Sequence, residues 1–134
     1  MSDTFIVEVV TPTSIKTFED VRHIRAPGLD GSFGVLSRHI PAIIALRPGE
    51  VIIDVGNKRQ SLAVSDGYCE IESEKILLLT ETAERPEDID VERANTALGR
   101  AIDRLKERPK ELDVNRAMAA VQRAKNRLKI AEKS

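Results

Sequence analysis

The chain has 134 residues, of which 41% are hydrophobic and 3% aromatic, and its formal net charge at pH 7 is −1. This length fits one average domain, or a compact domain of about 85 residues with an appendage, and no apolar stretch approaches the roughly 20 residues needed to span a bilayer. The single cysteine, Cys69, excludes an internal disulfide framework and favours a reducing compartment. The first residues lack a basic region followed by an apolar one, so we expect no secretory signal and a cytosolic protein.

Before Pro86 the sequence alternates short β-type or apolar runs with turn residues. Val, Ile and Thr favour strands, and the Pro, Gly, Asn and Asp residues between the runs favour turns. The runs cover residues 5–11, 14–17, 21–26, 31–36, 42–46, 50–55, 59–64, 68–72 and 76–82, with turns at 27–31, 47–49, 56–57 and 66–67. Short strands with turns about every 8–12 residues predict an antiparallel β-sandwich of about ten strands.

After Pro86 the sequence predicts two helices, over residues 90–107 and 113–132. Asp88 or Asp90 can cap the first helix and Asp113 the second, because an aspartate oxygen can accept from a free N–H of the first turn. Pro109 ends the first helix, since the residue before a proline avoids helical angles. We therefore predict an α+β protein with a sandwich over residues 1–85 and a helical domain over residues 86–134.

Each predicted helix has an apolar seam at alternating three- and four-residue spacing, which is typical of an antiparallel helical hairpin. The seam residues are Ala94, Leu98, Ala101 and Leu105 in the first helix, and Val114, Ala117, Val121, Ala124, Leu128 and Ala131 in the second. Half of them are alanines, which allow close approach but bury much less apolar area than leucines. The hairpin should therefore be marginally stable by itself, and a ligand of modest differential affinity could shift it.

Charge divides along the same line as structure. Residues 1–89 hold 9 Lys and Arg against 15 Asp and Glu, a net charge of −6, whereas residues 90–134 hold 12 against 7, a net charge of +5. This division predicts an acidic body and a basic tail that meets anions or an acidic partner.

The sequence contains no clear pattern of a catalytic site or a metal site. His23 and His39 are the only histidines, and with one cysteine they are too few for a zinc site and form no convincing catalytic triad. The chain also lacks the glycine-rich loop and lysine of a P-loop nucleotide site. We therefore expect no catalytic residues and no metal site.

The arginines carry a stronger signal. Arg93, Arg100 and Arg104 are spaced i, i+7, i+11 on one face of the first helix, and Arg123 and Arg127 are spaced i, i+4 on the second. Guanidinium groups are fork-shaped donors that suit phosphate. The same spacing is compatible with a solvated basic face, or with a nucleic-acid tail, although the chain has no aromatic residue after position 68 that could stack on bases.

Several stretches together resemble a known family. Residues 31–42, GSFGVLSRHIPA, are similar to a Gly-x-x-Gly-x-Leu-x-x-His-x-Pro loop, and residues 46–49, LRPG, to the Leu-x-Pro-Gly turn that follows it. Residues 66–72 are similar to a glycine-containing strand, and residues 89–94, IDVERA, to an I-D-x-x-R-A motif of ATP-binding members. The family with these features in this order is the epsilon subunit of bacterial F-type ATP synthase.

The resemblance implies a ten-stranded sandwich that attaches to the gamma subunit and the c-ring as part of the central stalk. It implies that the helices can extend into the alpha and beta subunits of the catalytic head and block ATP hydrolysis, and that ATP, with or without Mg²⁺, holds them compact as a regulatory ligand. The implied ATP contacts are Glu84, Ile89, Asp90, Arg93, Ala94, Arg100, Arg123 and Arg127.

The resemblance also implies that the loop over residues 31–42 contacts the rotor. His39 matches the family pattern, whereas Ser32 stands where the family often has an acidic residue. The expected location is the cytoplasmic face of the plasma membrane, with membrane contact only through the complex and no nucleic acid. The alternative is a stand-alone scaffold or nucleic-acid adaptor with a basic helical arm.

Overall fold

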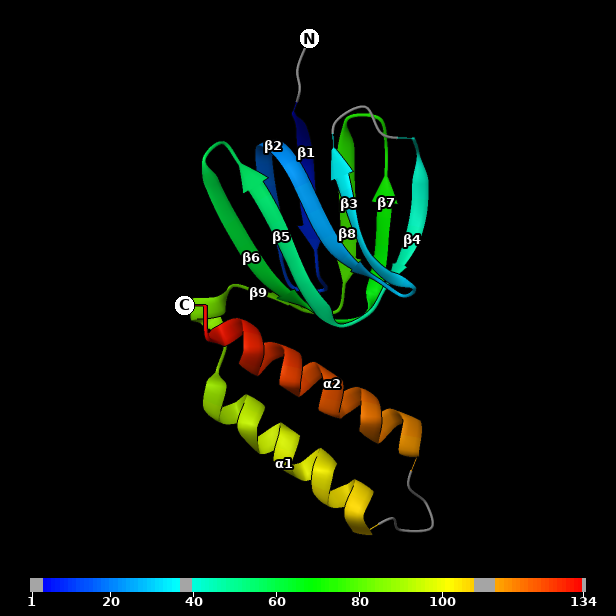
Figure 1. Ribbon diagram of the computed structural model, residues 1–134, viewed down its shortest axis with the longest axis vertical. Coiled ribbons are helices and arrows are strands. Elements are labelled where there is room, and N and C mark those ends of the chain that lie inside the picture. The colour runs from blue at the N-terminus through cyan, green and yellow to red at the C-terminus, as the bar shows by residue number, and fades with distance from the viewer. Residues whose placement is uncertain (1–3, 37–39, 108–112, 134) are drawn as a thin grey trace. The chain divides into compact units, whose positions relative to one another are not determined.

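The computed structural model describes residues 4–36, 40–107 and 113–133. The chain divides into two compact units, Met1–Glu84 and Arg85–Ser134, of which the first contains strands and the second helices (Figure 1). No helix of the described residues is long and apolar enough to cross a membrane.

The first unit is the predicted sandwich, and its described residues form nine strands. They are β1 (Phe5–Val10), β2 (Ile15–Gly28), β3 (Gly31–Leu36), β4 (Ala42–Leu46), β5 (Gly49–Val55), β6 (Lys58–Val64), β7 (Gly67–Ile71), β8 (Lys75–Thr80) and β9 (Ala83–Glu84). Their hydrogen-bonded order is β1-β8-β7-β4-β2-β5-β6-β9, with β3 beside β2 and a further pairing between β1 and β2. The group of β1, β8, β7 and β4 faces the group of β2, β5 and β6 across the core (Figure 1).

Strand β2 joins the two layers. Its first half pairs with β1, as in Val7 opposite Phe18, and its second half pairs with β5, as in Ile24 opposite Ile53. Between the halves, Asp20 has a φ of 56° and the register shifts in both pairings. Such a bulge bends a strand and lets it pass from one sheet to another.

The continuity of β2 corrects two expectations. The sequence predicted separate strands over 14–17 and 21–26, but the backbone remains paired through the bulge. It also predicted a turn over 27–31, whereas the strand extends through Gly28 and only Leu29 and Asp30 form the turn into β3.

One strand pair is parallel. Strands β1 and β8 pair in parallel from Ile6 with Lys75 to Val10 with Leu79, and all other pairs are antiparallel. A parallel pair requires a long crossover, which β2 to β7 supply here. The predicted antiparallel sandwich is confirmed, but this parallel pair was not foreseen, because sequence periodicity does not reveal which distant strands meet.

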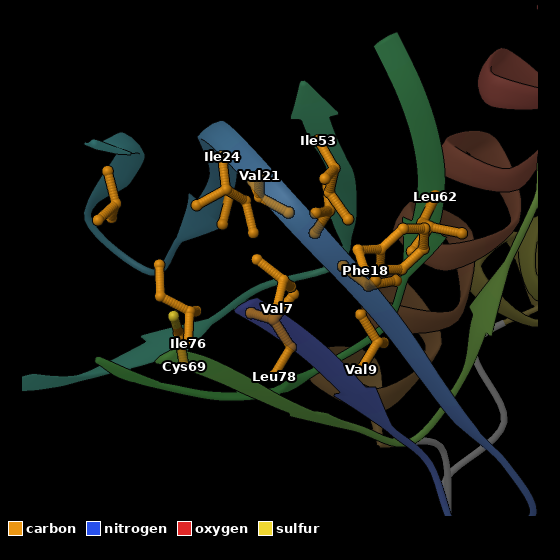
Figure 2. Packing of buried hydrophobic residues seen from close by; sticks show 14 of the residues in the cluster. Val7, Val9, Phe18, Val21, Ile24, Ile53, Leu62, Cys69, Ile76 and Leu78 are labelled. Carbon is orange, nitrogen blue, oxygen red and sulfur yellow. The ribbon is translucent and has the colours of Figure 1, made fainter. Parts of the chain in front are cut away.

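The core of the sandwich is aliphatic. Alternate residues of β1 and β8 face those of β2, β5 and β6, and residues labelled in Figure 2 show this interdigitation. Cys69 is among them as a buried core side chain, and this burial raises the pKa of its thiol to about 12. The labelled set is Val7, Val9, Phe18, Val21, Ile24, Ile53, Leu62, Cys69, Ile76 and Leu78.

The second unit begins with a short 3-10 helix, η1 (Pro86–Asp88), followed by α1 (Val91–Glu107) and α2 (Val114–Ala131). The two α-helices lie antiparallel, as predicted (Figure 1). Pro109, the predicted helix terminator, lies outside the described residues.

The seam of the hairpin is built from alanine. Every predicted seam alanine is buried, while the predicted seam residues Leu98, Leu105, Val121 and Leu128 are only half-buried. Val114 is exposed, contrary to its predicted place in the seam, because it begins α2 next to the connection between the helices. Ile130, which was not among the predicted seam residues, is also buried in α2.

Two glycines, one in the sandwich and one in α1, give a test of how closely the chain packs at each position. A Cβ at Gly67 would collide with the backbone carbonyl oxygen of Leu79, whereas a Cβ at Gly99 would meet no heavy atom within 4 Å. We expect Gly67→Ala to destabilise the sandwich by about 1–3 kcal/mol, as overpacking does. Gly99→Ala should instead stabilise α1 by about 1 kcal/mol, the helix-propensity difference. Urea unfolding followed by circular dichroism measures both; equal stability of Gly67→Ala and the wild type would contradict the close strand approach.

Candidate functional site

A groove runs along the hairpin between α1 and α2. Its volume is about 520 Å³, and both helices contribute alternating small and basic side chains to its walls. The residues are Ala97, Arg100, Ala101 and Arg104 from α1, with Asp113, Arg116, Ala117, Ala120 and Arg123 from the start and first half of α2.

The helical period places these residues on one face of each helix. The α1 positions are spaced i, i+3, i+4, i+7, and residues with this spacing share a helix face. Alanine at the facing positions leaves space between the helices, and the longer arginines at the edges make the groove basic. The same small residues that form the seam therefore also create the groove.

The groove is strongly positive. Four of its side chains are guanidiniums and only Asp113 is a carboxylate. Within the described residues, none of the four guanidiniums forms an ion pair with a carboxylate. The Asp113 carboxylate accepts a hydrogen bond from the backbone N–H of Arg116 at 3.0 Å, which caps α2 as predicted. Such a groove suits an anion, and guanidinium forks suit phosphate above other anions.

Among the predicted ATP contacts, the structure brings Arg100 and Arg123 together in the groove. Arg127 follows Arg123 by one turn of α2 and is half-buried. Since the helices are antiparallel, Arg127 lies toward the beginning of α1, where exposed Arg93 is found.

The I-D-x-x-R-A segment forms the junction between η1 and α1. Ile89 and Ala94 are buried, and η1 contacts α2. Asp90 caps α1, since its Oδ1 accepts from the backbone N–H of Arg93 at 3.0 Å and its carbonyl accepts from that of Ala94. Asp90, rather than Asp88, is thus the capping residue. Glu84, the other predicted contact, is the last residue of β9 and is half-buried.

The predicted site set omitted two arginines of the groove. Arg104 belonged to the predicted basic face of the first helix, but Arg116 was missed altogether. A signal for Arg116 existed: Arg116, Arg123 and Arg127 repeat the i, i+7, i+11 spacing of Arg93, Arg100 and Arg104.

The sandwich has a second candidate surface, on the outer side of the layer that contains β1, β7 and β8. Residues opposite one another in register form an apolar row across five strands, and Tyr68 and Ile15 in it are 58% and 68% exposed. Ile43, near the row on β4, is also exposed. The row consists of Ala45, Tyr68, Leu79, Val10 and Ile15.

The predicted rotor residues are only partly described. Ser32 is exposed on β3, opposite Pro27. His39 lies outside the described residues.

His23 takes part in a surface network of the sandwich. Its Nδ1 lies 3.6 Å from Asp54 Oδ2, and Arg59 Nε donates to Asp54 Oδ1 at 2.9 Å. The hydrogen bond from Arg59 lowers the pKa of Asp54. In the part of the chain that the structure describes, no group of three His, Cys, Asp or Glu residues could hold a metal ion.

Comparisons with known proteins match both units. The family model described as "ATP synthase, Delta/Epsilon chain, beta-sandwich domain" matches residues 4–86, and that described as "ATP synthase, Delta/Epsilon chain, long alpha-helix domain" matches residues 87–132. The chain therefore belongs to the ATP synthase Delta/Epsilon chain family. Within it, the chain is an epsilon subunit of ATP synthase, a non-catalytic member of the complex. This membership replaces the alternative of a stand-alone scaffold or nucleic-acid adaptor.

Similar bacterial proteins carry the same description. The "ATP synthase epsilon chain" of Geotalea uraniireducens (strain Rf4) is 43% identical over 106 residues, covering 79% of this chain and 77% of the relative. That of Carboxydothermus hydrogenoformans is 44% identical over 105 residues, covering 78% of each chain.

Solved structures share the fold at low identity. A chain of the Euglena gracilis mitochondrial ATP synthase superimposes with a TM-score of 0.80 at 19% identity, covering 94% of this chain and 79% of that one. A chain from the central stalk and c-ring of the Tetrahymena thermophila enzyme gives a TM-score of 0.61 at 14% identity, covering 98% and 96%.

The dual position of Asp90, in the cap and in the predicted nucleotide motif, can be dissected by substitution. Asp90→Ala should lower the stability of α1 by about 0.5–2 kcal/mol, because a backbone N–H loses its acceptor. Asp90→Asn should keep most of that stability, since asparagine caps about as well as aspartate. Thermal unfolding followed at 222 nm without ligand measures the difference; an equal loss in both variants would show that charge, not capping, is the stabilising property.

Proposed function

We propose that this epsilon subunit is a regulatory part of the central stalk, in which the sandwich binds the rotor and the hairpin responds to ATP. In the compact hairpin, ATP occupies the basic groove and ATP hydrolysis proceeds. Without ATP the helices separate, extend into the alpha and beta subunits and inhibit hydrolysis. The observation that carries this proposal is the basic groove between two helices packed mainly through alanines, whose four guanidiniums form no ion pair among the described residues.

The apolar row of the sandwich supports the rotor contact. Exposed apolar side chains that line up across several strands mark an interaction surface more often than scattered ones do. We assign the row to the gamma subunit, and the exposed edge around Ser32 to the c-ring. Such contacts would place the protein at the cytoplasmic face of the plasma membrane, held there by its partners.

The packing of the hairpin supports the conformational response. Its buried seam consists largely of alanines, so the helices gain little apolar burial for closing. A ligand that binds only the compact form adds stability of RT ln(1 + [L]/Kd), about 2.7 kcal/mol at a hundredfold excess over Kd. That amount is enough to decide between two states that differ by a few kcal/mol.

The positions of the site residues suit a nucleotide. Arg93, Arg100, Arg123 and Arg127 are placed along the facing helices to pair with the triphosphate, and any Mg²⁺ would arrive on those phosphates. Asp90 offers the adenine amino group its second carboxylate oxygen, because the first accepts the capping hydrogen bond. The family resemblance adds Glu84 as a further acceptor, while Ile89 and Ala94 supply apolar contacts.

Removal of the hairpin tests the inhibitory role. The hydrophobic core of the sandwich draws all its members from residues 5–83, so a chain ending at residue 87 should fold and assemble. We expect ATP synthase reassembled with this shortened subunit to hydrolyse ATP faster than the complex with the full chain. Equal hydrolysis rates, with the shortened subunit shown to be incorporated, would remove the inhibitory role.

Calorimetry on the isolated full-length protein tests the nucleotide site. Arg93→Ala and Arg123→Ala should each weaken ATP binding about tenfold or more, because each removes a charge-assisted contact. Arg22→Ala, on the exposed side of β2, is a matched control that should bind ATP like the wild type. If the wild type gives no binding heat and no thermal shift with ATP, the nucleotide part of the proposal fails while the inhibitory role stands.

A further inference from the structure

The proposed nucleotide contacts leave part of the groove unused. Arg104 and Arg116 line it together with Arg100 and Arg123, and they lie toward the connection between the helices. The I-D-x-x-R-A segment lies at the opposite end of α1. The groove therefore continues beyond the residues assigned to ATP.

The repeated spacing of the arginines predicts three levels along the hairpin. Each helix has arginines at i, i+7, i+11, and the helices are antiparallel, so the two sets pair in reverse order along the hairpin. In this order the first level is Arg93 with Arg127, the middle level Arg100 with Arg123, and the last level Arg104 with Arg116, and the groove lining contains the middle and last levels. From first to last level the distance is about 16 Å along α1, at the rise of an α-helix.

The last two levels concentrate uncompensated charge. None of their four guanidiniums is paired with a carboxylate within the described residues, and the one carboxylate of the groove, Asp113, already accepts the capping hydrogen bond from the backbone of Arg116. Like charges that share a groove repel, so a bound anion lowers the free energy of the compact hairpin.

The remaining wall residues define the size and type of this anion. Apart from the four arginines and Asp113 they are all alanines, and no aromatic ring lines the groove to stack on a base. Arginine pairs on opposite walls can each direct two N–H groups to one phosphate. The last two levels thus suit one or two phosphate groups without a nucleoside.

We propose that Arg104 and Arg116, with Arg100 and Arg123, form a binding site for inorganic phosphate anions, orthophosphate or pyrophosphate, that stabilises the hairpin without a nucleoside. The site shares its middle level with the proposed nucleotide site, so nucleotide and pyrophosphate compete. The compact state then depends on the concentrations of both inorganic phosphate anions and ATP. This inference rests on the groove and does not require the nucleotide assignment.

Thermal unfolding of the full-length protein at 222 nm tests the site, since both α-helices of the described chain belong to the hairpin. We expect pyrophosphate to raise the midpoint by several degrees above that in sodium chloride of equal ionic strength. Calorimetry with pyrophosphate should show affinity reduced at least tenfold in Arg104→Gln/Arg116→Gln. The control Arg22→Gln/Arg25→Gln, which removes the same charge from the exposed side of β2, should bind like the wild type.

Arg116→Lys provides a second variant, which keeps the positive charge but loses the forked donor geometry of the guanidinium. It should bind pyrophosphate severalfold more weakly than the wild type. Equal effects of pyrophosphate and sodium chloride, or unchanged affinity in Arg104→Gln/Arg116→Gln, would overturn the inference.

The outcome can be separated from that of the proposed nucleotide site. Asp90→Asn should weaken ATP binding and leave pyrophosphate binding unchanged, because Asp90 lies at the far end of the hairpin. Pyrophosphate binding in a protein that fails to bind ATP supports the inference and removes the nucleotide proposal. ATP binding without pyrophosphate binding supports the nucleotide proposal and overturns the inference of a phosphate site.

Discussion

The close contact of α1 and α2 through alanine determines what the second unit can do. Ala94 and Ala101 on one helix and Ala117 and Ala124 on the other are buried, and their small size lets the backbones approach. The same closeness brings the flanking arginines of both helices to one groove. A seam of leucines would bury more apolar area and close the hairpin more firmly, but it would also fill the groove. Weak packing between the helices and the basic groove thus both result from alanine at the contact positions.

The sandwich, unlike the hairpin, is held together by a core of large side chains. Its core takes large aliphatic side chains from both layers, and β2 connects those layers through the bulge at Asp20. Because β2 pairs with strands on both sides, the layers cannot slide apart without breaking two ladders. A body of this kind can hold a constant outer surface, such as the row around Tyr68, while the helical unit changes state. The contrast in core residues therefore fits the proposed roles of the two units, a sandwich that binds the rotor and a hairpin that changes conformation.

Local features were predictable from the sequence, and long-range ones were not. The seam alanines and the Asp113 cap follow from spacing and capping chemistry, which act over a few residues. The parallel pairing of β1 with β8 and the exposed apolar row from Ala45 to Ile15 depend on which distant strands pair with one another. The hydrophobic periodicity of the sequence contains no information on that pairing. Arg116 was missed although its spacing with Arg123 and Arg127 was visible in the sequence, because the groove that it shares with Arg104 is seen only in the folded hairpin.

Charge also gives a physical reason why the proposed ligands would favour the closed hairpin. In the proposed extended state the two arginine sets are far apart, so the repulsion between them vanishes and opening becomes easier. Added salt weakens that repulsion in the closed state as well, because the screening length is about 10 Å at 0.1 M ionic strength. Screening, however, provides no directed hydrogen bonds, whereas a phosphate group between opposed guanidiniums accepts several at once. A phosphate ligand should consequently stabilise the closed hairpin beyond any effect of ionic strength, and the arginine pairs on opposite helices are the reason.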